Sequence, residues 1–369
     1  MKNRTYRNAA RRHLLKAIAA MGALGYLSSS PLSSAEPDSA LPDQENPTAA
    51  NLRKEFLDWK FGMFIHFNIA TFNQREWATG HEDPSTFSPE KLDCGQWIDA
   101  AASAGMKYAV LTVKHTGGWC LWDSKHTESH DMTAFSNYKG GKGDIVREFV
   151  DACRKRGLKV GLYYCFPGDF SQRAGLPQGK EDLHGLPPEA KGDFSGFIKK
   201  QLTELLTEYG TIDLLWIDQY RNPYTPPADW LEIRNHIKGL QPGCLVIANN
   251  SHDFKETDIH SYEYPWMLER NPSKALPAEG NTDPGEVCDK MGPGWFWTPD
   301  ESGEDLMTAE EAVKMLKLCN SRQANYLLNV APDASGLIPT YALERLREIG
   351  GLLAVEEPSE TGDNENADR

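Results

Sequence analysis

The sequence predicts an α/β protein built as a single (β/α)8, TIM-like barrel. Short apolar runs alternate with amphipathic helical patterns from residue 51 to residue 355, which indicates a parallel sheet whose strands are joined by helices. Eight runs can be strands, and this number favours a closed barrel over an open, doubly wound sheet. Roughly 300 residues suit one such barrel. Since the chain ends soon afterwards, we expect no C-terminal β-sandwich domain.

The expected strands are short runs rich in apolar and β-branched residues. The run over 212–217 has apolar neighbours on both sides, which is typical of a strand buried on both faces of a parallel sheet, and it stops at Asp218. The run over 258–263 is less apolar, and the run over 294–297 is very short. In chain order, we predict strands at 61–66, 108–115, 159–165, 212–217, 245–250, 258–263, 294–297 and 326–330.

The expected helices show apolar residues at helical spacing, with an acidic or hydroxyl residue at the start and often glycine at the end. The clearest lies over 144–157, where Asp144 can cap the first turn and Gly157 can end the last. Two acidic residues in the first turn favour a helix that starts at Thr308. The predicted helices cover 97–105, 144–157, 193–210, 229–240, 308–318 and 339–353.

Residues 1–35 have the pattern of an export signal. Arg11 and Arg12 precede an apolar stretch over 17–27, and small residues ending at Ala35 suit a cleavage site. The apolar stretch is too short to cross a bilayer, and the paired arginines resemble a twin-arginine signal. We therefore expect export to the periplasm or the extracellular space, with no membrane-spanning segment.

Composition limits the rest of the chain. Residues 36–50 read as a linker, and residues 356–369 as an acidic, disordered tail. Residues 1–35 hold six basic and no acidic residues, so their removal takes the net charge from −14 to about −20. Such an acidic protein is not expected to bind nucleic acid, which needs a basic surface. The oligomeric state stays open, and an oligomer is possible.

The seven cysteines are scattered and lack paired spacing, so we expect buried core thiols rather than a disulfide framework or a zinc site. No glycine-rich dinucleotide motif follows the first strand. Metal-dependent barrel hydrolases usually present a His-x-His pair on the first strand, whereas this chain has only His66 there. We therefore expect neither a cofactor nor a metal.

Polar and aromatic residues follow one another at the ends of the predicted strands. Because the carboxyl ends of barrel strands meet at one mouth, these side chains should form a ring there. Aromatic faces with carboxylates and amides suit a neutral polyol such as a sugar. The members of the ring are His66, His115, Tyr164, Asp218, Asn249, Glu263, Trp297 and Asn329.

Glycoside cleavage requires two carboxyl groups, one to attack or stabilise the sugar cation and one to protonate the leaving oxygen. Asp218, at the end of a buried strand, is the natural candidate for the first role. Glu263 and Glu286 are the candidates for the second. Glu286 is expected in a loop over 283–289, and spacing alone does not choose between the two glutamates.

A set of short motifs spread over residues 52–353 carries a family resemblance. The motifs are 61–66 with Glu76 and Trp77, 114–123, 161–164, 213–218, 285–289 with 294–297, and 325–330 with 332–338. Together they resemble the α-L-fucosidases of glycoside hydrolase family 29.

The resemblance implies a retaining exo-glycosidase that releases terminal α-L-fucosyl residues from fucosylated oligosaccharides or glycoconjugates. In this interpretation Asp218 is the nucleophile and Glu286 the general acid/base, with their carboxyl groups about 5–5.5 Å apart. The residues that would bind the substrate are His66, Trp77, Lys114, His115, Tyr164, Glu263 and Trp297.

The chain departs from that family pattern after His115. Many members have a second histidine and a carboxylate where this chain has Thr116 and Gly117, and Trp119 could instead serve a neighbouring subsite. These differences keep two alternatives open. One is a catalytically weak or inactive fucose-binding barrel, and the other is a related glycosidase with a shifted sugar specificity.

Overall fold

The computed structural model describes residues 47–127, 129–166, 190, 192–220, 228–251 and 256–356. The predicted export signal and the tail beyond residue 356 lie outside the described residues. The described part contains eight parallel strands in a closed barrel, in sequence order from β1 to β8 with β8 pairing with β1. The predicted (β/α)8 barrel is therefore confirmed.

The strands match the predicted runs closely, with one exception. In the structure they are β1 (Phe61–Ile65), β2 (Tyr108–Lys114), β3 (Lys159–Cys165), β4 (Leu214–Asp218), β5 (Leu245–Ala248), β6 (Ile259–Glu263), β7 (Gly285–Lys290) and β8 (Ala324–Asn329).

The prediction of the seventh strand at 294–297 was wrong. Strand β7 occupies Gly285–Lys290 instead, and residues 291–296 form bends. Pro293 lacks the backbone N–H that a strand needs, which disfavours sheet pairing in this stretch. The true strand has only Val287 and Cys288 as apolar residues, so its apolar signal is weak.

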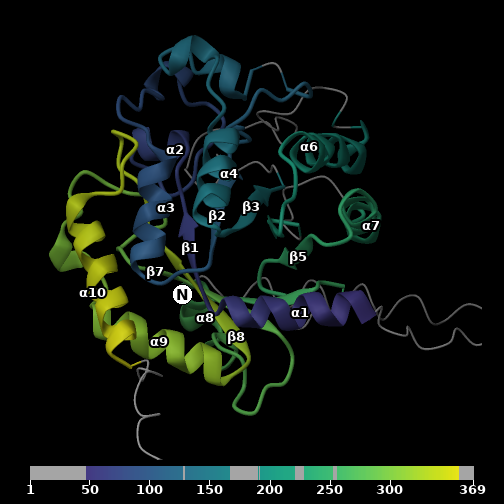
Figure 1. Ribbon diagram of the computed structural model, residues 1–369. Helices are drawn as coiled ribbons and strands as arrows, with labels where there is room; N and C mark the ends of the chain where they lie inside the picture. The colour runs from purple at the N-terminus through teal and green to yellow at the C-terminus, as the bar shows by residue number, and fades with distance from the viewer. Residues whose placement is uncertain are drawn as a thin grey trace, which may run out of the picture. The chain divides into compact units, whose positions relative to one another are not determined.

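Helices surround the strands, as Figure 1 shows. The described helices are α1 (Pro47–Trp59), α2 (Ile69–Phe72), α3 (Cys94–Ser103), α4 (Ile145–Arg156), α6 (Phe194–Glu208), α7 (Trp230–Leu240), α8 (Tyr264–Arg270), α9 (Ala309–Ser321) and α10 (Thr340–Glu356). Among the residues placed in the structure, none of these helices is both long and apolar enough to cross a membrane.

Local capping sets the ends of several helices. Asp144 accepts a hydrogen bond from the backbone N–H of Arg147 at the start of α4, and Gly157 ends that helix with a left-handed backbone at φ 72°. Thr308 and Glu311 form a reciprocal capping box at the start of α9. These helix starts and stops were readable in the sequence because they depend on neighbouring residues only.

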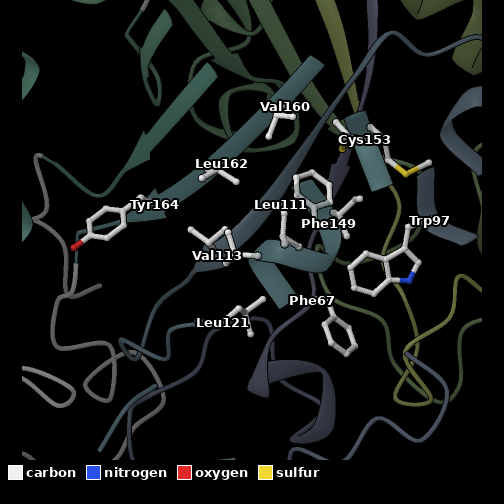
Figure 2. Close-up of a cluster of buried hydrophobic side chains, with 14 of the residues drawn as sticks. Phe67, Trp97, Leu111, Val113, Leu121, Phe149, Cys153, Val160, Leu162 and Tyr164 are labelled. Atoms are coloured by element: carbon white, nitrogen blue, oxygen red, sulfur yellow. The ribbon is translucent and has the colours of Figure 1, made fainter. Parts of the chain in front are cut away.

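The core has two layers that follow the alternation of side chains along each strand. Outward-facing residues pack beneath the helices: Figure 2 shows Leu111 and Val113 of β2 beside Val160 of β3 and Phe149 of α4. Inward-facing side chains fill the barrel, including Phe64, Tyr108, Tyr163, Trp216 and Cys288. The seven cysteines are all buried free thiols.

Helix α1 closes the amino-terminal end of the barrel. Its Phe56 and Trp59 belong to the inward-facing cluster, with ring centroids 6.0 and 5.4 Å from that of Tyr108. The backbone carbonyl of Phe56 also accepts a hydrogen bond from the Asn325 side chain at 2.6 Å. The helix begins at Pro47, inside the stretch predicted as linker. With this end filled, the opposite end of the barrel carries the opening described below.

Candidate active site

A pocket of about 600 Å³ opens at the carboxyl ends of the strands. This is the end at which (β/α)8 barrels bind ligands, and the volume suits one sugar residue with part of a second group. Its walls combine aromatic rings, imidazoles, amides and carboxyl groups. The lining includes Phe64, His66, Glu76, Trp77, His115, Tyr163, Trp216, Asp218, Asn249, Asn250, Glu263, Trp266, Arg270, Lys290 and Trp295.

Asp218 is the last residue of β4 and lies in this pocket. Its carboxylate oxygens accept hydrogen bonds from the Tyr163 hydroxyl at 2.7 Å, the Gln219 backbone N–H at 2.7 Å and the Asn249 amide at 3.0 Å. Gln219 has a left-handed backbone at φ 60°, which turns the chain sharply after the strand. The donors hold the Asp218 side chain in one orientation at the pocket wall.

Glu263 is the last residue of β6 and immediately precedes α8. One of its oxygens accepts hydrogen bonds from the side-chain amides of Asn249 at 3.0 Å and Asn250 at 3.1 Å. Burial and the nearby charge of Asp218 raise the pKa of Glu263 to about 7, although the two amides act in the opposite direction. A carboxyl group with this pKa can give up and take back a proton near neutral pH.

The two carboxyl groups share one donor. The Asn249 amide nitrogen lies 3.0 Å from an oxygen of Asp218 and 3.0 Å from an oxygen of Glu263, so these oxygens are within about 6 Å of each other. Retaining glycosidases separate their carboxyl groups by about 5–5.5 Å, and inverting ones by about 6.5–9.5 Å. The geometry of this pair therefore suits attack by one carboxylate with proton transfer by the other.

Two imidazoles lie beside the carboxyl pair and are held neutral. Burial lowers the pKa of His66 to about 3. The hydrogen bond between its Nδ1 and the Asn329 side-chain oxygen, at 2.7 Å, acts in the opposite direction. Burial and repulsion from His66 lower the pKa of His115 well below its usual value. In each ring Nδ1 is bonded within the protein, to Asn329 or to Thr116, so Nε2 is the ring nitrogen that can meet a hydroxyl group of a neutral sugar.

The floor and one wall of the pocket are aromatic. Trp216 stacks on Tyr163 with ring centroids 5.4 Å apart and an interplanar angle of 23°, and Phe64 lies 5.3 Å from Trp216. On the other side, both carboxylate oxygens of Glu76 accept the backbone N–H of Trp295, at 2.9 and 3.1 Å. Glu76 thereby ties the loop after β1 to the loop after β7.

Glu286 does not reach the pocket, which corrects its predicted place in a loop at the mouth. It is the second residue of β7, fully buried inside the barrel. Its oxygens accept hydrogen bonds from the Tyr108 hydroxyl at 2.6 Å and from Nε1 of Trp216 at 2.7 Å. The error follows from the missed strand β7. Glu286 lies near the start of this strand with its side chain facing inward, so it points into the core and not into the mouth.

Three further predicted residues lie away from the pocket. Lys114 and Tyr164 are buried on the outer face of the barrel, where Lys114 donates to Tyr164 at 3.1 Å and to the Gln201 side-chain oxygen at 2.6 Å. Trp297 donates its indole N–H to the Tyr341 hydroxyl at 3.1 Å. The remaining predicted residues, His66, Trp77, His115, Asp218 and Glu263, do line the pocket.

The sequence reading missed the neighbours of the residues that it named. Tyr163, Trp216 and Trp295 line the pocket, whereas Tyr164 and Trp297 do not. The alternation of side chains along a barrel strand could have identified these pocket residues. Tyr163 is in register with Trp216, and both face inward. Asn249 was recognised as a strand-end residue, but its link between two carboxyl groups depends on the closed barrel.

The departure after His115 leaves a compact loop. Thr116 is buried beside His115, with its hydroxyl 3.2 Å from Nδ1 of that histidine. Gly117 has φ 86°, and a Cβ there would lie 2.8 Å from the backbone nitrogen of Gly80. Trp119 is buried and donates to Glu82 at 2.9 Å, so it forms no neighbouring subsite.

The described residues contain no group of three or more histidine, cysteine, aspartate or glutamate side chains placed to hold a metal ion. The site combines the Asp218–Glu263 carboxyl pair with neutral imidazoles and aromatic walls at the mouth of a parallel barrel. This is the class of arrangement used by barrel glycoside hydrolases.

Comparison with known proteins identifies the family. The sequence profile of the family described as Alpha-L-fucosidase matches residues 79–357. The chain belongs to the α-L-fucosidase family.

Relatives and solved structures agree with this assignment. Alpha-L-fucosidase 1 of Arabidopsis thaliana is 30% identical over 323 residues, which cover 80% of this chain and 59% of the plant protein. Human plasma alpha-L-fucosidase is 29% identical over 360 residues, covering 85% of this chain and 70% of the human protein. The structure of alpha-L-fucosidase isoenzyme 1 from Paenibacillus thiaminolyticus is 29% identical with a TM-score of 0.66, covering 84% and 76% of the two chains. The chain spans about three fifths of the length of the plant relative.

We expect the imidazole of His66 to remain neutral from pH 8 down to about 4. Its pKa in the folded protein is about 3, against 6.5 for an unperturbed histidine. Only the unfolded chain takes up this proton between those values, so the contribution of His66 to the unfolding free energy should decline as the pH falls through this window. NMR of ¹⁵N-labelled histidine, assigned with His66→Asn, would measure it. A His66 signal that titrates near pH 6.5 would contradict the expectation.

Proposed function

We propose that the chain is a retaining α-L-fucosidase that hydrolyses terminal α-L-fucosyl residues from oligosaccharides or glycoconjugates, with Asp218 as nucleophile and Glu263 as general acid/base. The observation that carries this proposal is the Asn249 amide, which bridges these two carboxyl groups in one pocket. Membership of the family and the sugar-sized aromatic pocket support it. Glu263 replaces the predicted Glu286, whose carboxyl group lies outside the pocket.

The reaction takes two displacements. A carboxylate oxygen of Asp218 attacks the anomeric carbon while the bond from that carbon to the leaving oxygen breaks, and Glu263 donates its proton to that oxygen. In the second step, the Glu263 carboxylate removes a proton from water as the water oxygen attacks the same carbon and releases Asp218. Configuration is retained because the carbon is inverted twice. Glu263 is suited to both roles because its pKa is about 7.

The leaving group would lie on the side of α8. Glu263 is the residue directly before this helix and must come within hydrogen-bond reach of the leaving oxygen. Trp266, Glu269 and Arg270 share one helix face and line the pocket. The indole of Trp266 offers an apolar surface to the ring of a leaving sugar. The guanidinium of Arg270 lies over that indole, 3.0 Å from the ring centroid.

We further propose that the protein is exported to the periplasm or beyond, on the basis of the signal pattern in residues 1–35. Fractionation of expressing cells, with Arg11 and Arg12 replaced by Lys as the matched variant, would locate it. Retention of the unaltered protein in the cytoplasm would overturn this assignment.

Asp218→Asn should abolish turnover with the fold intact. An amide cannot form the covalent intermediate, so kcat/KM on an aryl α-L-fucoside should fall roughly 1,000-fold or more. Asp213→Asn is the matched control, because Asp213 precedes the same strand and accepts the backbone N–H of Val160 at 2.8 Å, away from the pocket. Wild-type activity in Asp218→Asn would remove Asp218 from the mechanism.

Glu263→Gln should discriminate between leaving groups. Natural fucosyl linkages need protonation, so kcat/KM should fall about 10²–10⁴-fold, while an activated aryl fucoside should be affected far less in the first step. Wild-type kcat on the natural linkage should decline as the pH rises through about 7, because Glu263 then loses its proton. The variant should lack this decline. An unchanged alkaline limb in Glu263→Gln would assign the acid elsewhere.

Trp266→Ala should weaken the use of fucosyl oligosaccharides about tenfold and leave a small aryl fucoside nearly unaffected. Loss of one stacked aromatic contact worth about 1.4 kcal/mol gives an effect of this size. Trp297→Ala removes an indole outside the pocket and serves as control. Equal losses on both substrates in Trp266→Ala would show that the leaving group does not contact α8.

A further inference from the structure

A fully buried carboxyl group lies beneath the pocket and takes no part in the reaction proposed above. Glu286 accepts the Tyr108 hydroxyl at one oxygen and Nε1 of Trp216 at the other, at 2.6 and 2.7 Å. These three residues come from β7, β2 and β4. The carboxyl group therefore links three strands across the interior of the barrel, where branched apolar side chains are the usual filling.

A chain of contacts joins this carboxyl group to the nucleophile. The indole of Trp216 lines the pocket above Glu286 and stacks on Tyr163, with 5.4 Å between ring centroids. The Tyr163 hydroxyl then donates to an oxygen of Asp218 at 2.7 Å. A rotation of the indole would displace Tyr163 and so change the orientation of Asp218.

The hydrogen bond to Glu286 restricts that rotation. The torsion that turns an indole about its bond to Cβ is broad and roughly two-fold, and the directed bond from Nε1 adds a preference for one ring orientation. Burying a carboxyl group in the core is costly, and an apolar residue of similar volume would often be neutral or stabilising there. Glu286 thus offers orientation rather than stability.

We propose that Glu286 is a positioning residue. The Tyr108 hydroxyl holds its carboxyl group, and its hydrogen bond from Nε1 of Trp216 fixes that indole as the floor of the pocket and thereby orients Asp218 through Tyr163. Only the expected changes in kcat and KM rest on the proposed function. The orientation of the indole is a property of the protein without substrate, and it can be observed separately.

The test compares Glu286→Leu with Glu286→Gln. Leucine removes both acceptors, so Trp216 loses its partner, and we expect kcat/KM of the folded enzyme to fall at least about tenfold with a raised KM. The amide oxygen of glutamine can still accept the indole N–H, so Glu286→Gln should stay within about threefold of the wild type. Its alkaline limb should remain near pH 7, because Glu263 supplies the proton.

Glu204 provides a matched control elsewhere in the chain. Glu204 is a buried residue of α6 that accepts the indole N–H of Trp122 at 2.9 Å. Neither residue lines the pocket. Glu204→Leu likewise removes the acceptor of a buried indole N–H, yet it should leave KM and the kcat of the folded fraction unchanged. If Glu286→Leu does not fold, Glu286→Asp replaces it. Aspartate keeps the charge but is one methylene shorter, and it should raise KM at least about threefold.

Wild-type kcat and KM in Glu286→Leu, or in Glu286→Asp if leucine is not tolerated, would overturn the proposal. Inactivity of Glu286→Gln on natural linkages alone would also overturn it, by returning the acid/base role to Glu286. If the wild-type protein cleaves no α-L-fucoside, the proposed function fails, and the crystal structure of the Glu286 variant then decides the inference. A turned indole with a displaced Asp218 supports the positioning role, and an unmoved indole refutes it.

Discussion

The arrangement of this site depends on one side-chain amide. Asn249 donates to Asp218 and to Glu263 from the same nitrogen, and so brings two acidic groups within about 6 Å inside a largely buried pocket. Two carboxyl groups at this separation repel each other when both are charged. Burial and the Asp218 charge raise the pKa of Glu263 to about 7, and the amides of Asn249 and Asn250 limit that rise. The bridging amide therefore sets both the separation of the pair and the balance of its protonation.

The surroundings of the pair favour a neutral, hydroxylated ligand. His66 and His115 are uncharged because they are buried, and Trp216, Tyr163 and Trp295 supply apolar faces. The cations that line the described pocket, Arg270 and Lys290, come from α8 and the end of β7. Lys290 donates to the backbone carbonyl of Pro293 at 2.7 Å, so it also holds the loop after β7. The described lining thus offers hydrogen-bonding groups and aromatic faces beside its charged groups.

The barrel and part of the site could be predicted because their signals are local. Apolar runs give strands, and capping residues such as Asp144, Gly157 and Thr308 set helix ends within a few residues. An inward-facing residue at the end of a recognisable strand, such as Asp218, reaches the mouth of a parallel barrel. Helix α1 was missed because its role, filling the amino-terminal end of the barrel, depends on the aromatic side chains that it meets there.

The sequence by itself determined that a parallel barrel forms and that Asp218 and Glu263 stand at its mouth, because strand periodicity and strand ends depend on nearest neighbours along the chain. Only the tertiary structure showed that Glu263 lines the pocket and that Glu286 lies inside the barrel. Once the seventh strand is placed at Gly285–Lys290 instead of 294–297, the Glu286 carboxyl group moves from the expected mouth to the core. Side-chain direction also alternates at every residue of a strand. The same alternation separates Tyr163 from Tyr164. Which donor meets which carboxylate follows from closure of the barrel, which joins residues far apart in the sequence.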